Sequence, residues 1–328
     1  VDGNGQGAGF DLGRGGQATL NINSGGKLQV TGGTNPQQTG VRIGRDSGSV
    51  AVTTVSGAGS ELSVSGHVAN VDVGNGAGAT GTLNVLNLGR VVSGGLNIGV
   101  NGGHGTVMVD GATVEINNGF YGRVLVGTAG NGMLTVANGG LVDATLNPGA
   151  CVGVWCGNLV GYRAGATGTL TVTGAGSELR TLRNFNVADV WVDQFGGTPG
   201  ANTTGTINVL AGGTLRTQGA TLGSGAGGPL ALGTEQSFAS VLIDGTGSQW
   251  IVTRNTVDNG TAFMNMATHV NATATTTVSG GGLLRIDGGG SIGPYDGLGI
   301  GTAGHATLTV TGSGSKLEVL GANPYINV

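Results

Sequence analysis

Short segments in which apolar and polar residues alternate run along nearly the whole chain. In "GTLTVTGAGSELR" (168–180), Leu170, Val172 and Leu179 stand between polar or small residues. Alternation with a period of two residues is typical of a strand that buries one face. The phrase "ATLTVTGSGSKLE" (306–318) is a near-copy of the first one. The pattern therefore indicates a structural unit that the chain repeats.

Looser copies of this phrase occur elsewhere in the sequence. Aligning them on the residue equivalent to Val172 gives ten anchor residues, separated by 24 to 37 residues. The anchors are Ile22, Val55, Val85, Val109, Val136, Val172, Val209, Ile243, Val278 and Val310. Repeats of this length are typical of solenoids, propellers and other arrays.

Each copy contains three alternating segments with turns between them. The first resembles "TLTV", the second follows a turn, as at Leu62 and Val64, and the third resembles "VDVG", as at Val71 and Val73. No copy has ten residues at helical spacing. Three strands per copy predict an all-β fold, a right-handed parallel β-helix of about ten rungs with neighbouring strands about 4.8 Å apart. We expect residues 1–328 to form a single β-helix domain, a fragment of a longer protein.

Other repeat architectures fit the pattern less well. A β-propeller would need about four strands per repeat and periods of about 40 residues or more. A β-sandwich would show hairpin signals, and a left-handed hexapeptide helix would show a six-residue period that this sequence lacks.

Composition restricts the partners of the protein. The chain has 73 glycines among 328 residues but is 38% hydrophobic, which indicates a folded chain rich in turns and not a flexible linker. Its net charge of −4 includes no run of either sign, so we expect no nucleic-acid partner. No segment approaches the roughly 20 apolar residues of a transmembrane helix.

The repeated phrase, with the sister copies "GTLNVLNLGRVV", "GTINVLAGGTLR" and "TTTVSGGGLLRI", resembles the repeat of type V secretion autotransporter passenger domains. The similarity covers essentially the whole chain. It implies a secreted, non-enzymatic scaffold or adhesin on a bacterial surface, held at the outer membrane through a part absent from this chain. The implied partners are glycans or proteins of host or neighbouring cells, with self-association as a further option.

The two cysteines, Cys151 and Cys156, lie close together in "CVGVWC". In an exported protein this spacing predicts a small local disulfide, and two cysteines are too few for a closed zinc site. Two thiols, one of them buried, are the alternative.

Our candidate ligand-binding residues begin with the segment "ADVWVD" (188–193). Asp189, Trp191 and Asp193 alternate with two valines, which places both acids and the indole on one face of a strand. An exposed indole between carboxylates suits sugar stacking and hydrogen bonding to hydroxyls. The alternative is that Trp191 packs against a neighbouring loop.

Two long insertions lie in the same part of the chain. Residues 146–168 contain Trp155 and Tyr162, which we add to the candidate ligand-binding site, and residues 182–205 form the second insertion. Loops that protrude from one side of a solenoid often carry recognition.

Catalysis is less well supported by the sequence. The competing hypothesis is a polysaccharide hydrolase or lyase, because some parallel β-helices degrade polysaccharides, and it requires charged residues that converge across rungs. The two acids of one strand, Asp189 and Asp193, would lie about 13 Å apart, too far to act as a pair. We expect no catalytic residues, cofactor or metal. A trimeric surface fibre is a third option and would need exposed apolar strips.

Overall fold

The computed structural model describes residues 8–32, 38–117, 122–145, 157–191, 198, 201–227, 235–254, 262–289 and 297–328. The side chains of residues 38, 39, 191 and 225–227 lie outside this description. All regular secondary structure in the described ranges is β-strand. Internal contacts divide the chain into two compact units, Val1–Cys156 and Gly157–Val328, which we call unit 1 and unit 2.

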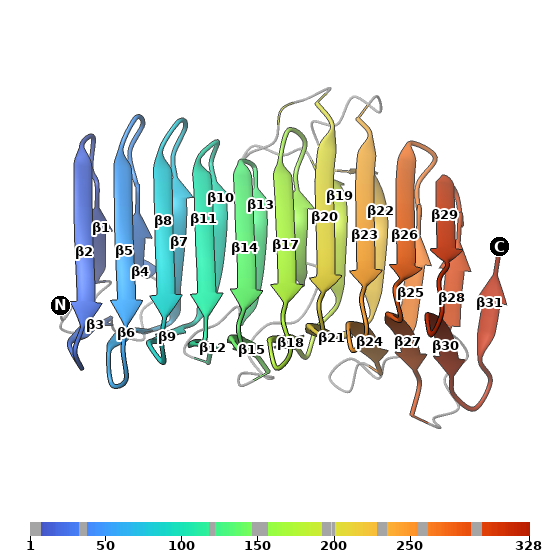
Figure 1. The fold of residues 1–328 in the computed structure, drawn as a ribbon. Coiled ribbons are helices and arrows are strands. Elements are labelled where there is room, and N and C mark those ends of the chain that lie inside the picture. Colours follow the sequence, from blue (N-terminus) through green and yellow to red (C-terminus); the bar gives the residue numbers. More distant parts are fainter. Residues whose placement is uncertain are drawn as a thin grey trace. The chain divides into compact units, whose positions relative to one another are not determined.

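Unit 1 contains three parallel sheets (Figure 1). Sheet 1 has the order β2 (Gln17–Asn23), β5 (Val50–Ser56), β8 (Thr80–Leu86), β11 (His104–Asp110) and β14 (Asn131–Ala137). Sheet 2 consists of β3 (Lys27–Thr31), β6 (Glu61–Ser65), β9 (Arg90–Ser93), β12 (Thr113–Ile116) and β15 (Leu141–Ala144). Sheet 3 consists of β1 (Gly9–Leu12), β4 (Gln38–Ile43), β7 (Val68–Asn75), β10 (Gly95–Val100) and β13 (Arg123–Thr128).

Unit 2 repeats this arrangement, with sheets numbered in the same way. Sheet 1 consists of β17 (Thr167–Thr173), β20 (Thr203–Leu210), β23 (Ser237–Asp244), β26 (Ala272–Ser279) and β29 (His305–Val310). Sheet 2 consists of β18 (Glu178–Thr181), β21 (Thr214–Gln218), β24 (Gln249–Thr253), β27 (Leu283–Asp287) and β30 (Lys316–Leu320). Sheet 3 consists of β16 (Asn158–Tyr162), β19 (Phe185–Trp191), β22 (Ala220–Gly227), β25 (Phe263–Met266), β28 (Gly297–Ile300) and β31 (Tyr325–Asn327).

The strand register confirms the repeat alignment and the predicted fold class. In unit 1 the successive register partners are Ile22, Val55, Val85, Val109 and Val136. In unit 2 they are Val172, Val209, Ile243, Val278 and Val310. Within each unit in Figure 1, the chain runs down sheet 1, crosses through sheet 2 and returns upward through sheet 3 behind sheet 1, one position further along. Each coil is therefore right-handed, the hand that parallel crossovers favour.

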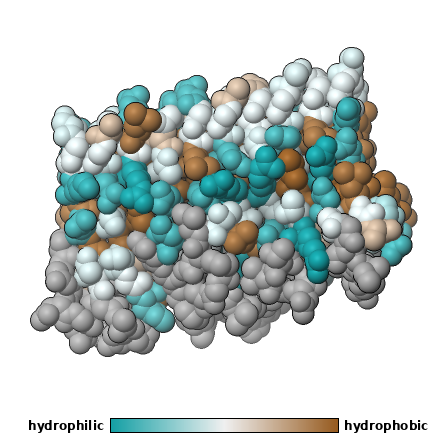
Figure 2. Space-filling model, turned by 90° about the horizontal axis from the view of Figure 1, so that it is seen from below, coloured by the Kyte–Doolittle hydropathy of each residue, from teal (hydrophilic) through white to brown (hydrophobic). Residues whose placement is uncertain are grey.

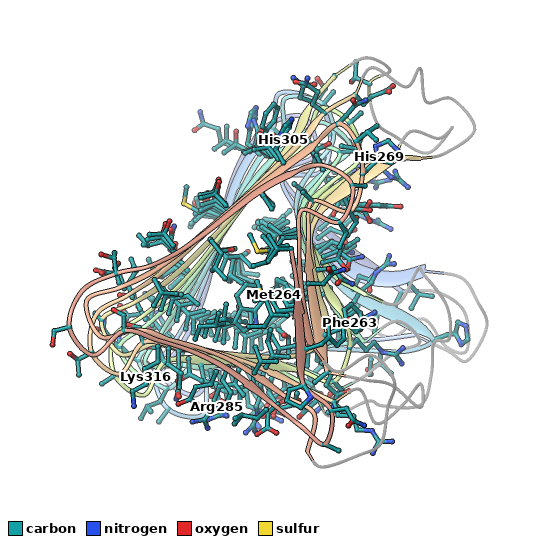
Figure 3. The ribbon with its side chains drawn as sticks, turned by 90° about the vertical axis from the view of Figure 1, so that its right-hand side faces the viewer. Phe263, Met264, His269, Arg285, His305 and Lys316 are labelled. Carbon is teal, nitrogen blue, oxygen red and sulfur yellow. The ribbon has the colours of Figure 1, made fainter. Side chains whose placement is uncertain are left out.

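The apolar positions of all three sheets point into the coil. Of the ten anchors, all except Val310 are buried. Figure 3 shows the same arrangement in sheet 3, where Met264 points inward and its neighbour Phe263 points away from the core. Full burial of a large apolar side chain stabilises a fold by about 1.5–3 kcal/mol, so these stacked rows supply most of the stability.

Tight corners join sheet 3 to sheet 1. Gly74, at the end of β7, has a φ of +68°, which only glycine adopts without strain. A Cβ on this residue would overlap the backbone carbonyl of His104, in the strand β11. The close approach of two chain segments thus explains why this corner requires glycine.

Ion pairs between successive turns cover the outer face of sheet 2. In unit 1 the Arg90 guanidinium donates to Glu61 at 2.6 Å and to Glu115 at 2.7 and 2.9 Å, so one arginine links three turns. Figure 2 views the molecule from this side, where hydrophilic side chains lie among scattered hydrophobic ones. The guanidinium of Arg90 is thus partly exposed but paired along the coil axis.

Replacing Arg90 tests how much this network contributes to stability. Because Arg90 is 42% exposed, water screens the pairs, and we expect Arg90→Met to lower the free energy of unfolding by only about 1 kcal/mol. Added salt should reduce the difference from wild type, as chemical denaturation at low and high ionic strength can measure. A loss several times larger, insensitive to salt, would show that Arg90 acts through packing.

Candidate functional site

The structure brings two of the predicted ligand-binding residues together. Tyr162 of β16 and Asp189 of β19 are register partners in sheet 3 of unit 2, and Ser224 of β22 is the next partner in the row. Each of the three follows a residue with left-handed φ, which is Gly161, Ala188 or Gly223. The three side chains therefore occupy equivalent places at the corner toward sheet 1.

Asp189 lies in a half-buried position within this row. Burial raises the pKa of its carboxyl group, and hydrogen bonds from Ser224 and Asn186 oppose the shift. The backbone carbonyl of Asp189 accepts a hydrogen bond from the N–H of Arg163 at 2.9 Å. The carboxyl group is thus held by polar neighbours, in an environment that favours its protonated form more than water does.

Tyr162 is buried, with 9% of its surface exposed. The Arg163 guanidinium carbon lies 5.4 Å from the centre of its ring, within the range of a cation–π contact. Val190 on the next turn packs with Ala164, and Ala201 covers this pair. Tyr162 therefore packs within the corner next to Asp189, and little of its surface is free to contact a ligand.

The strand β19 departs from regular geometry where the predicted site lies. Its register with β22 shifts between Asp189 and Trp191, and such a bulge re-aims the side chains on either side of it. The side chain of Trp191 and all of Asp193, Trp155, Cys151 and Cys156 lie outside the described residues. The predicted binding role of these residues and the predicted disulfide stay predictions.

The described part of the site offers hydrogen-bonding groups and one carboxyl group. The register partners of Asp189 are a tyrosine and a serine, so the row holds no second carboxylate beside it. Among the described residues, no cluster of three or more His, Cys, Asp or Glu side chains could hold a metal ion. The same residues include no helix that is long and apolar enough to cross a membrane. Hydrogen bonding to a polar ligand is the chemistry that this row supports.

A polar ladder crosses sheet 3 of unit 1. Arg42, Asp72 and Asn97, which recur at one place of the third segments, are successive register partners. Asn97 donates to Asp72 at 2.7 Å and Arg42 donates to Asp11 at 2.9 Å. Burial raises the pKa of Asp72, while the hydrogen bond from Asn97 and the charge of Arg42 act against the shift.

Replacing Asp189 by asparagine should change how stability depends on pH. The raised pKa means that the folded state binds the proton more tightly than the unfolded state, so wild type loses stability as pH rises from the ordinary aspartate pKa through the raised value. Asp189→Asn cannot ionise. We expect it to match wild type at about pH 3 and to be the more stable protein at about pH 8, measured by urea unfolding across that range.

Ser224→Ala provides the matched control for this prediction. It removes a hydrogen bond that lowers the pKa of Asp189, so the loss of stability should extend to higher pH than in wild type. If the free energy of unfolding of wild type, Asp189→Asn and Ser224→Ala changed with pH in the same way, the raised pKa could not belong to Asp189.

Comparison with known proteins gives one likeness in solved structures. No family model and no curated protein matches the chain. The solved structure is described as "Crystal structure of TibC-catalyzed hyper-glycosylated TibA55-350 fragment". It is 18% identical, with a TM-score of 0.19 over 98% of this chain and 94% of that chain. A likeness of this size supports no conclusion about the function of this chain.

Proposed function

We propose that this protein is a non-enzymatic surface scaffold of the autotransporter passenger type, which mediates adhesion or aggregation through its outward ladders and protruding loops. The autotransporter repeat that the sequence resembles supports display outside the cell. We propose glycans or proteins of host or neighbouring cells as its partners, and the corner around Asp189 and Trp191 as one place of contact.

The observation that carries the proposal is the regular outer surface of the coil. In sheet 1 of unit 1, Asn21, Thr54 and Asn84 are successive register partners with outward side chains. Because every turn adds an equivalent position about 4.8 Å further along, this row carries a hydrogen-bonding side chain, asparagine or threonine, on three successive turns. Weak contacts that repeat in this way give high avidity when a partner also repeats its binding groups.

Adhesion of coated beads tests the proposal. Beads carrying the purified chain should adhere to cultured cells or to one another more than beads carrying heat-denatured chain. Trp191→Ala should reduce adhesion if the proposed corner contributes, and a glycan array with both proteins should show whether the bound partner is a sugar. Coated beads that neither adhere nor clump more than the denatured control would contradict the proposed function.

A polysaccharide hydrolase or lyase is the second candidate function, and the raised pKa of Asp189 is the observation that favours it. Carboxyl groups that act as general acids have their pKa raised in the same way. Incubating the chain with polygalacturonate and with neutral glucans, and assaying new reducing ends, separates the two functions. Cleavage that Asp189→Asn abolishes would establish the enzyme and overturn the non-enzymatic proposal.

A further inference from the structure

The outer face of sheet 1 in unit 2 carries two adjacent rows of polar side chains around one aromatic ring. The first row consists of Thr167, Thr204, Phe238, Thr273 and His305. The second row consists of Thr169, Thr206, Ser240, Thr275 and Thr307. We call the two rows together the hydroxyl face. His305, which is labelled in Figure 3, belongs to the hydroxyl face and lies on the outside of β29.

Phe238 is an exception on this polar surface. Its side chain is exposed, at 38%, and its register partners on both sides are the threonines Thr204 and Thr273. An exposed aromatic ring among hydroxyl groups contributes nothing to the core of the coil. Such a ring offers an apolar face with negative potential, on which the C–H groups of a sugar ring can pack.

The hydroxyl groups of the second row have no partners within the described protein. No side-chain hydrogen bond involves Thr169, Thr206, Ser240, Thr275 or Thr307 in the described ranges. Each hydroxyl donates one hydrogen bond and accepts others, so the row is a line of unused donors and acceptors about 4.8 Å apart. This separation is close to the length that one pyranose ring adds to a polysaccharide chain.

Charge distinguishes this face from the neighbouring sheet of the same unit. Neither row contains Asp, Glu, Lys or Arg. The outer face of sheet 2, by contrast, carries the pairs Glu178–Arg216 and Arg285–Glu318, both at 2.7 Å. In Figure 3, Arg285 and Lys316 project from that wall, whereas His305 projects from the wall of the hydroxyl face. An anionic or cationic partner would find no complementary charge on the two rows, so the face suits an uncharged one.

We propose that the hydroxyl face is a binding site for a neutral oligosaccharide, with one sugar ring stacked on Phe238 and neighbouring sugar hydroxyls bonded to Ser240 and Thr275. A second protein chain is a poorer fit, since the centre of a protein interface is largely apolar and this face offers one apolar ring. The inference narrows the proposed adhesive function to one surface and one class of ligand, and in that sense rests on it.

Methyl NMR of the full chain with labelled threonines tests the site. The probes are the neutral hexasaccharides cellohexaose, maltohexaose and mannohexaose, with hexagalacturonate as the charged comparison. We expect at least one neutral probe to bind saturably and to shift the methyl signals of Thr204, Thr206, Thr273 and Thr275, with no such shifts from hexagalacturonate. Phe238→Ala should weaken this binding about tenfold, the equivalent of one stacking contact.

Two further variants control for altered folding. Thr275→Val keeps the shape of the side chain but removes its hydroxyl, and should weaken binding several-fold. Thr106→Val makes the same change on the outer face of sheet 1 in unit 1 and should leave binding at the wild-type value. All variants should keep the wild-type melting temperature, because the replaced side chains are exposed.

The inference is overturned if no neutral probe binds, if the shifts fall outside the hydroxyl face, or if Phe238→Ala binds as well as wild type. It is also overturned if the shifts depend on protein concentration and the mass in solution increases, since the occupant is then a second copy. If the coated beads adhere but no saccharide binds, this inference is wrong and the proposed function stands. If a saccharide binds but the beads do not adhere, the proposed function is wrong and this inference stands.

Discussion

Gly74→Ala should lower the free energy of unfolding of unit 1 by about 3 kcal/mol, one of the largest effects expected of a single substitution here. Two costs add at this corner. Alanine must adopt the left-handed φ of +68°, and its Cβ overlaps the carbonyl group of His104 in the strand β11. The overlap is with backbone, which cannot move aside as the end of a flexible side chain can. Denaturant unfolding monitored by circular dichroism measures the loss.

Gly48→Ala is the matched control for this experiment. Gly48 has almost the same φ, +72°, but a Cβ there would meet nothing within 4 Å. It should therefore show the conformational cost alone, about 1 kcal/mol. Equal losses for Gly74→Ala and Gly48→Ala would show that the close approach of the corner to β11 does not constrain the fold.

Trp250→Ala should destabilise unit 2 by about 4 kcal/mol. Trp250 is completely buried in sheet 2 and is the largest of the fully buried side chains among the described residues. Its indole N–H donates to the hydroxyl of Thr217 at 3.0 Å. Truncation leaves a cavity and also leaves a buried hydroxyl group without its donor. Chemical denaturation gives the size of the loss, and hydrogen exchange should place it in the turns that adjoin β24.

Two conservative variants separate the cavity from the hydrogen bond. Trp250→Phe keeps most of the apolar volume but leaves Thr217 unpaired, and should cost about 1–2 kcal/mol from the hydrogen bond alone. Adding Thr217→Val removes the unpaired hydroxyl and should recover part of that loss. If Trp250→Ala changed stability by less than about 1 kcal/mol, the stacked core would not be the main source of stability.

Both predictions concern local features of a repeating structure. In a solenoid each turn contacts mainly its neighbours, so stability is close to a sum of turn and interface contributions. A defect at Gly74 or Trp250 should therefore open the adjoining turns before the rest of its unit. Hydrogen exchange can check this order of opening residue by residue.

The strands and the side chains that point into the core could be predicted from the sequence. Anchors such as Val172 and Val209 recur at one place of a two-residue alternation, and the same residues stack in the core as register partners. Apolar residues at alternating positions leave only one face to bury, so the pattern determines which side of each strand points inward. The row that contains Phe238 could have been found from the sequence in the same way, because Phe238 and His305 each lie five residues before their anchors. It was not predicted as a site, because threonine, serine and phenylalanine are common on strands and indicate a ligand site less directly than acids and tryptophans do.

The outward contacts between turns depended on the tertiary structure. Arg90 bonds to Glu61 and Glu115, which lie 29 and 25 residues away, and these separations vary because the connecting loops vary in length. Asp189 is half-buried at the corner where Ala188 takes the left-handed position that glycine holds at 161 and 223, and its burial depends on the turns packed around it. Local alternation alone determined the strands, the period and the buried face of this protein. Only the assembled coil decided which side chains of different turns meet, because that depends on how loops of unequal length return the chain to register.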